Sequence, residues 1–235
     1  MCVAAVALSA SPRWRLVMIG NRDEYHQRPT APLSRWNNGI LAGRDLQAGG
    51  TWLGANAAGR FALVTNYRVD GYPRAHLASR GALVAHWLLG SGPDGIAAMN
   101  PFNLLLVDGP QAWHLTNHPA PQRRLLDPGI HGLSNGGFDD RWAKTLALEA
   151  ALAGWLERDD AAMEPLFTAL RSEAPLPGPG PSPEFSSAFI RNPLYGTRCS
   201  TVLTVDAGGA GRIAERRFDA DGQATGETVL DFRWD

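Results

Sequence analysis

The chain begins with two short, mostly apolar runs separated by polar turn residues. Residues 1–8 and 14–20 form the two runs, and residues 9–13 read Ser-Ala-Ser-Pro-Arg. Short apolar runs bounded by turn residues are typical of buried strands, and Ser and Pro favour turns. The pattern therefore predicts a β-hairpin at the start of the chain.

The predicted hairpin brings polar residues to the first cysteine. With the loop centred near residues 11 and 12, antiparallel pairing places Cys2 opposite Asn21, give or take one residue. Arg22 and Asp23 follow Asn21 directly, so both are expected close to the Cys2 thiol. Cys2 is thus predicted to lie beside a cluster of polar and charged groups.

Apolar runs around Gly-containing turns predict further strands and hairpins along the chain. The expected strands cover residues 40–42, 51–54, 60–67, 103–108, 112–117, 130–135, 195–206, 212–218 and 227–234. Apolar residues at helical spacing predict helices over residues 76–90 and 141–156. Asp159 and Asp160 are expected to cap a further helix that ends near Arg171.

These elements predict the fold class and the domain organisation. Hairpins favour antiparallel sheets, and helices packed outside two such sheets give a four-layer αββα sandwich of the α+β class. The chain has 235 residues, of which 44% are hydrophobic, so it can bury a sizeable core. We expect one domain over residues 1–235, with a Pro-rich loop at residues 174–184.

Composition and charge exclude several classes of protein. The net charge is −1, so the chain lacks the basic field that holds a nucleic-acid backbone. No apolar run reaches the ~18 residues of a membrane span, and the start of the chain lacks the positive region of a signal peptide. Two cysteines form no disulfide framework. A location in the reducing cytoplasm is therefore expected.

Cys2 is the candidate nucleophile. Removal of Met1 would leave a cysteine with a free α-amine, whose unperturbed pKa is about 7.7–8.0. Such an amine can take the thiol proton near neutral pH, and a nearby arginine would favour the thiolate. Alternatively, Cys2 is a small apolar residue of a buried strand, since free cysteine is among the most buried residue types. If Met1 is retained, the nitrogen of Cys2 is an amide and no base.

Several motifs together resemble the NRDE family, to which transport and Golgi organisation protein 2 belongs. They are Asn21-Arg22-Asp23-Glu24, Gly43-Arg44-Asp45, Gly49-Gly50-Thr51-Trp52-Leu53-Gly54, Thr65-Asn66-Tyr67, Ser79-Arg80-Gly81, Gly132-Leu133-Ser134-Asn135 and Tyr195-Gly196-Thr197-Arg198. They occur in the family's order and cover nearly the whole chain. The family is similar to cysteine N-terminal-nucleophile hydrolases such as penicillin V acylase, which implies the same αββα fold.

The resemblance implies roles for the residues around the thiol. Cys2 would be the nucleophile and, through its α-amine, the base. Arg22 would stabilise the thiolate, and Asp23 would orient the amine. In the hydrolases two residues separate the arginine from its carboxylate partner, whereas here they are adjacent, and adjacent side chains of a strand point to opposite faces. Either the backbone bends there, or Glu24 is the working carboxylate. Arg22 and Asp23 could also be a structural ion pair.

Three further residues receive roles from the same resemblance. Asn66 and Asn135 would donate hydrogen bonds to an oxyanion, and Arg198 would complete the charge network. The alternative for the two asparagines is that they cap strand ends. The spacing of His114 and His118 suits a metal only on a helix, and the neighbouring Thr, Asn and Pro disfavour a helix, so no metal is predicted.

Two functions follow from these candidates. The first is an amidohydrolase or acyltransferase that acts on a small acylated molecule through a Cys2 thioester, without a cofactor. The second is a non-catalytic haem-binding carrier, because the resemblance implies a link to haem trafficking. The sequence contains no Cys-x-x-Cys-His haem-attachment motif. A role in membrane traffic, which the family member's name suggests, has no membrane or coiled-coil signal to support it.

Overall fold

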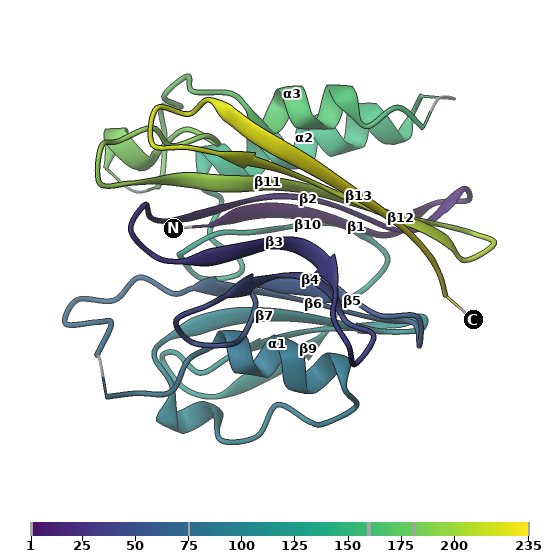
Figure 1. The fold of residues 1–235 in the computed structure, drawn as a ribbon, viewed down its shortest axis with the longest axis horizontal. Coiled ribbons are helices and arrows are strands. Elements are labelled where there is room, and N and C mark those ends of the chain that lie inside the picture. The colour runs from purple at the N-terminus through teal and green to yellow at the C-terminus, as the bar shows by residue number, and fades with distance from the viewer. Residues whose placement is uncertain (1, 75, 159–160, 181, 235) are drawn as a thin grey trace.

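The computed structural model describes residues 2–74, 76–158, 161–180 and 182–234, and it contains two antiparallel sheets stacked face to face (Figure 1). The six-stranded sheet has the strand order β10-β1-β2-β11-β12-β13 and the seven-stranded sheet the order β3-β4-β5-β6-β7-β8-β9. Helices α2 and α3 cover the outer face of the first sheet, and α1 covers that of the second (Figure 1). The predicted four-layer αββα sandwich of the α+β class is therefore confirmed.

The elements have the following bounds. The strands of the six-stranded sheet are β1 (Val3–Ser11), β2 (Trp14–Tyr25), β10 (Gly129–Leu133), β11 (Tyr195–Asp206), β12 (Ala210–Phe218) and β13 (Ala224–Arg233). Those of the seven-stranded sheet are β3 (Thr30–Arg35), β4 (Leu41–Asp45), β5 (Leu53–Ala55), β6 (Arg60–Asn66), β7 (Phe102–Asp108), β8 (Gln111–Thr116) and β9 (Gln122–Leu125). The α-helices are α1 (Gly81–Leu88), α2 (Ala143–Leu156) and α3 (Glu164–Leu170), and the 3₁₀ turns cover Ile96–Ala98 and Pro183–Phe185.

Strand β1 shows why its sequence is apolar without alternation. Successive side chains of a strand point to opposite sides. Both sides of β1 are covered, one by the other sheet and one by the helices, so the side chains of residues 3–8 are all buried. Ala4, Val6 and Leu8 enter the core between the two sheets. Val3, Ala5 and Ala7 enter the core between the six-stranded sheet and the helices.

The predicted first hairpin is present, and its second strand is longer than expected. Val3 pairs with Asn21, so Cys2 lies one register position from the predicted partner, within the stated margin. Strand β2 continues through Tyr25 because β11 pairs with it as far as Tyr195. The Asn21–Glu24 tetrad therefore lies inside a strand.

Two strands and two helix starts differ from the sequence predictions. Strands β3 and β9 were not predicted; both are edge strands with few buried side chains, and β3 contains Pro32, which edge strands tolerate. Helix α1 begins at Gly81 and not at residue 76, because Ala78 instead forms a bridge with Met99. Helix α3 begins at Glu164, and the expected caps Asp159 and Asp160 lie outside the described residues.

Among the described residues, no helix is both long enough and apolar enough to cross a lipid bilayer.

Candidate active site at the start of the first strand

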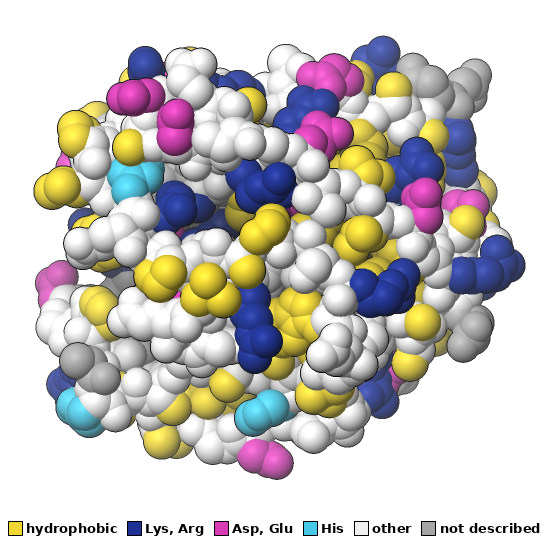
Figure 2. Space-filling view, in the orientation of Figure 1, with side chains coloured by type: hydrophobic (Ala, Val, Ile, Leu, Met, Phe, Trp, Pro, Cys, Tyr) yellow, Lys and Arg dark blue, Asp and Glu magenta, His cyan; other side chains and the backbone are white. Residues whose placement is uncertain are grey.

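A cavity of about 430 Å³ opens between the two sheets, at the end where β1 begins and β6 finishes. In Figure 2, which has the orientation of Figure 1, basic side chains border a hollow at the height between the two sheets. Cys2, Arg22, Asp23 and Asn66, four of the six residues predicted for the site, line the cavity. The other two, Asn135 and Arg198, do not line it.

Cys2 is both buried and part of the cavity wall, so the two alternatives for this residue are compatible. Its side chain is only 7% exposed. Burial raises the pKa of the Cys2 thiol, and the charge of Asp23 acts in the same direction. The backbone N–H of Asp23 and the Arg22 guanidinium lower that pKa, but by less. The thiol is therefore protonated at neutral pH unless a base removes its proton.

The raised pKa leads to a prediction for alkylation of Cys2 by iodoacetamide. We expect the reaction to be slower at neutral pH than with an unburied cysteine and to accelerate at alkaline pH, because only the thiolate reacts. Arg22→Gln removes a cation that favours the thiolate, so the rate at a given pH should fall further. Mass spectrometry of the Cys2 peptide measures both rates. A rate that is already at its plateau at neutral pH would contradict the prediction.

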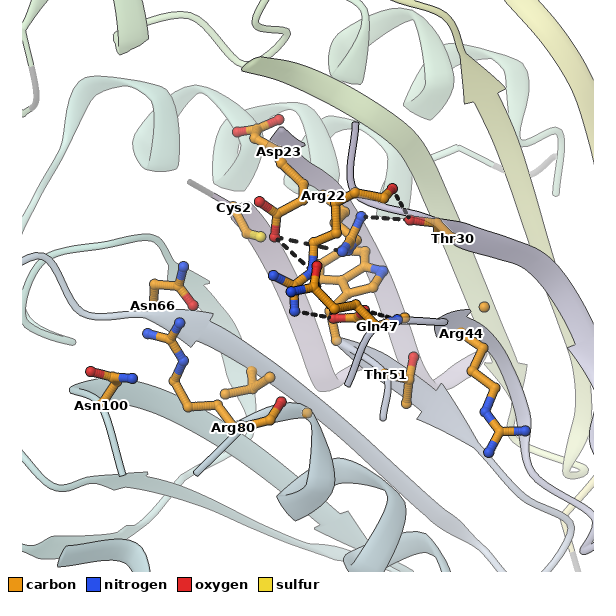
Figure 3. Close-up of a pocket in the computed structure, with 18 of the residues that line it drawn as sticks. Cys2, Arg22, Asp23, Thr30, Arg44, Gln47, Thr51, Asn66, Arg80 and Asn100 are labelled. Carbon is orange, nitrogen blue, oxygen red and sulfur yellow. Dashed lines mark hydrogen bonds and ion pairs between the residues drawn. The ribbon is translucent and has the colours of Figure 1, made fainter. Parts of the chain in front are cut away.

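Arg22 lies on the same face of β2 as Glu24. Its Nη1 donates a hydrogen bond to the Thr30 hydroxyl at 3.4 Å, and its Nη2 is 3.7 Å from Glu24 Oε2. Glu24 is also 3.7 Å from Arg28 Nε, and Arg28 donates to Asp45 at 2.7 Å. Opposite charges therefore alternate from Arg22 to Asp45 on the other sheet, and Figure 3 shows Arg22 beside Cys2 with its dashed contact to Thr30.

Asp23 faces the other side of the strand, as the alternation of side chains requires. The Thr197 hydroxyl donates to Asp23 Oδ1 at 2.7 Å, and the Tyr195 hydroxyl donates to the Asp23 carbonyl oxygen at 2.8 Å. Burial raises the pKa of the Asp23 carboxyl, against the opposing charge of Lys144. Figure 3 shows this carboxylate pointing away from the Cys2 sulfur. The backbone stays extended here, and Glu24 is the carboxylate that shares a face with Arg22.

The two asparagines have different places. Asn66, the last residue of β6, is exposed and lines the cavity. Asn135 is buried, and its Nδ2 donates a hydrogen bond to the carbonyl oxygen of Asn66 at 2.8 Å. The structure therefore brings Asn66 to the cavity and places Asn135 behind it, where Asn135 supports the backbone of Asn66.

Arg198 holds the turn that follows β2. Its Nη1 donates to the carbonyl oxygens of Tyr25, His26 and Arg28 at 3.0, 2.8 and 3.2 Å. The register of β11 against β2 shifts at this residue, between Thr197 and Cys199. Arg198 thus positions the end of the Asn21–Glu24 segment from outside the cavity.

Two cations near the thiol received no role from the sequence. Arg80 lines the cavity, although Ser79-Arg80-Gly81 was noted only as a family motif. Lys144, the only lysine of the chain, is 1% exposed and lies close enough to Asp23 to lower the pKa of its carboxyl. The signal for Lys144 was present, because it occupies the buried stripe of α2 with Leu148 and Leu152.

A buried polar network holds the first residues of β1 in place. The Ser134 hydroxyl donates to the Cys2 carbonyl oxygen at 3.1 Å, and the Thr65 hydroxyl donates to the Ser134 carbonyl oxygen at 2.6 Å. Asn103 Nδ2 donates to the Gly136 carbonyl oxygen at 2.8 Å, and its Oδ1 lies 3.1 Å from His114 Nε2. The thiol's position therefore depends on residues that are far away in the sequence.

The histidine of this network predicts a pH dependence of stability. Burial lowers the pKa of His114 to about 4, whereas an unfolded histidine titrates near pH 6.5. The unfolded state binds the proton first, so stability present above about pH 6.5 is lost as the pH falls towards 4, by up to about 3 kcal/mol. Urea unfolding across this range measures the slope. His114→Gln should flatten the dependence of the unfolding free energy on pH. The same change at the exposed His86 should leave that dependence unchanged. Equal slopes in both variants would contradict the assignment to His114.

The comparisons with known proteins agree with the resemblance noted in the sequence. The family model described as Transport and Golgi organisation 2 matches residues 1–220. The Transport and Golgi organization protein 2 homologs of Bos taurus and Homo sapiens are 32% and 31% identical to this chain, and each alignment covers 92% of both proteins.

The fold is also similar to that of a solved enzyme structure. It is the Caenorhabditis elegans N-acylethanolamine-hydrolyzing acid amidase ortholog, with a TM-score of 0.52 and 13% sequence identity. The similarity covers 86% of this chain and 92% of that one, and at this identity it concerns the fold alone. By the match of the family model over residues 1–220, the chain belongs to the Transport and Golgi organisation 2 family.

Proposed function

We propose that this protein is a cysteine N-terminal-nucleophile amidohydrolase or acyltransferase that acts on a small acylated molecule. The observation that carries the proposal is the Cys2 thiol in the wall of the cavity, beside Arg22. The N-terminal-nucleophile type of fold supports it, since that scaffold presents a residue at the start of a strand to a cavity between two sheets. The similar solved structure is that of an N-acylethanolamine-hydrolyzing acid amidase ortholog, which makes amides the first substrates to test.

The proposed reaction starts once Met1 has been removed. The α-amine of Cys2 takes the thiol proton, and the thiolate sulfur forms a bond to the carbonyl carbon of the substrate. The resulting oxyanion collapses, the C–N bond breaks, and the protonated α-amine returns its proton to the departing nitrogen. Water then attacks the thioester, which releases the acid and restores the thiol. An amine or alcohol in place of water would make the same chemistry an acyl transfer.

The remaining residues have roles that fit their places. The Arg22 guanidinium favours the thiolate that the buried site otherwise disfavours. The Asn66 side chain, on the opposite wall, is the proposed donor to the oxyanion, where one donor is worth roughly 10²–10³ in rate. Asn135 and Arg198 position Asn66 and the end of β2 from behind. Asp23, on the helix side of β2, is the proposed partner of the α-amine.

The test begins with the N-terminus of the protein isolated from its native cells. We expect intact-mass analysis to show a chain that lacks Met1. Incubation with a panel of N-acyl compounds should then add the mass of one acyl group to the peptide that contains Cys2. Complete retention of Met1 in native cells would overturn the amine-base mechanism, and the absence of any acyl adduct or product would overturn the hydrolase.

The alternative, a haem carrier, fits the cavity less well. Histidine, methionine, tyrosine and cysteine are the usual protein ligands of haem iron. Among the described residues that line the cavity, Cys2 and Cys199 are the only members of that set. Burial raises the pKa of both thiols, so iron would have to displace a more firmly held proton to bind either of them. A Soret-band titration at micromolar haem tests this option, and an unchanged spectrum would remove it.

A further inference from the structure

Arg80 occupies the wall of the cavity opposite the thiol, directly before α1. Its Nη1 donates a hydrogen bond to the carbonyl oxygen of Pro101 at 3.2 Å. Figure 3 shows the side chain extending from its own wall toward Asn66 and Cys2. The guanidinium is thus anchored at one nitrogen, while the group as a whole is presented to the space where a substrate would lie.

The charges around the cavity show why this arginine differs from the others. The arginines that line the cavity are Arg22, Arg28, Arg44, Arg74 and Arg80. Arg22 and Arg28 pair with Glu24 or Asp45. Arg44 and Arg74 are exposed, and their guanidinium groups lie over the rings of Trp36 and Tyr72 at 4.7 and 4.6 Å. Within the part of the chain that the structure describes, Arg80 has neither a carboxylate nor a ring as its partner.

The carboxylates of the described residues that line the cavity are engaged by other groups, so they leave Arg80 without a direct acidic partner. They are Asp23, Glu24, Asp45 and Glu215. Glu24 and Asp45 are already engaged by Arg22 and Arg28. Asp23 accepts a hydrogen bond from the Thr197 hydroxyl. Glu215 accepts one from the Leu33 N–H and pairs with Arg217 at 3.5 Å. Burial lowers the pKa of Arg80, and the charges of Cys2 and Glu24 oppose that shift only in part. An anion bound at the guanidinium would stabilise its charged form further.

We propose that Arg80 binds an anionic group of the substrate, a carboxylate or a phosphate, on the same acylated molecule whose carbonyl reaches Cys2. The inference rests on the proposed function and names the class of its substrate. A guanidinium presents its donors in a planar fork that matches both oxyanions. Arg80 is therefore a specificity-determining residue, and acylated molecules with a negatively charged head are preferred to neutral ones of the same length.

The test measures binding separately from turnover. The probes are N-lauroylglycine, N-lauroyl phosphoethanolamine and neutral N-lauroylethanolamine, and calorimetry measures their affinity for the Cys2→Ala variant, which cannot turn them over. We expect at least one anionic probe to bind more tightly than the neutral one. Adding Arg80→Gln should weaken that probe about 10- to 100-fold, the usual contribution of a charged hydrogen-bond pair, with little effect on the neutral probe. Whether the carboxylate or the phosphate probe binds more tightly identifies the anion.

The controls separate this role from a structural one. Arg44→Gln removes an equal charge from the rim and should leave the preference for the anion, whereas Arg80→Lys should keep part of it. Equal affinity of all three probes for the Cys2→Ala variant, or equal losses with the neutral and anionic probes in Arg80→Gln, would overturn the inference. If the unsubstituted protein forms neither product nor acyl adduct with these probes or with the panel of N-acyl compounds, the proposed function fails, while the binding data still decide the role of Arg80.

Discussion

Replacing Cys2 with alanine is expected to reduce amide hydrolysis or acyl transfer by at least about 10³-fold, because the nucleophile of a covalent mechanism has no substitute. The acyl adduct should disappear at the same time. Product formation and intact mass, measured on the same samples, check both effects. Folding should be little affected, since the thiol is a small group at the edge of the core between the sheets.

The second thiol of the cavity provides a matched control. Cys199 is also buried and lines the same space, where its neighbour is Glu215. Burial raises the pKa of the Cys199 thiol well above the usual value, and this residue within the chain has no free α-amine to take the proton, so the thiol is a poor nucleophile. Cys199→Ala should therefore keep most of the activity and the adduct. Equal activity in Cys2→Ala and the unsubstituted protein would remove the thioester mechanism.

Replacing Gly50 with alanine is expected to cause the largest loss of stability of any single methyl addition near the site. A Cβ at this position would lie 2.5 Å from the carbonyl carbon and 2.6 Å from the carbonyl oxygen of Gly81, and backbone atoms cannot turn aside as a side chain can. The two segments touch because the Thr51 N–H donates to the Gly81 carbonyl oxygen at 3.3 Å. Overpacking of this kind costs typically about 1–3 kcal/mol. Urea unfolding should show a lower midpoint.

The same substitution at Gly154 is the control with the opposite sign. Gly154 lies in α2 and is exposed, and a Cβ there would meet no atom within 4 Å. Alanine should stabilise the helix by roughly 0.5–1 kcal/mol. Because Arg80 directly precedes Gly81, Gly50→Ala should also weaken binding of anionic ligands, whereas Gly154→Ala should not. A Gly50→Ala variant as stable as the parent would contradict the close packing of these two segments.

The close contact of Gly50 with Gly81 also explains two of the family motifs. Residues 49–54 and residues 79–81 are separate in the sequence. In the structure their backbones touch, and the contact places Thr51 and Arg80 in the same cavity. Position 50 needs glycine because a Cβ there would collide with the backbone of Gly81. The cavity residues Thr51 and Arg80 are the sequence neighbours of these two glycines.

The hairpins were predictable because each combines two neighbouring apolar segments with turn-forming residues between them. The paired strands β1 and β2, and likewise β7 and β8, are adjacent in sequence, and their turns contain residues that favour turns. The neighbourhood of Cys2 and Arg22 followed from that register alone. Strands β3 and β9 gave no signal, because an edge strand buries few side chains and needs no apolar pattern.

The sequence by itself determined the layered α+β architecture, the first hairpin, and the presence of a cysteine beside an arginine, since strand periodicity and turn residues act over short distances. Only the tertiary structure decided which side chains meet at the cavity. It turned Asp23 to the helix side, put Asn135 behind Asn66, set Arg198 on the turn after β2, and brought Arg80 and Lys144 near the thiol. These contacts join segments more than 60 residues apart, so they depend on how the sheets and helices stack, which no local pattern contains.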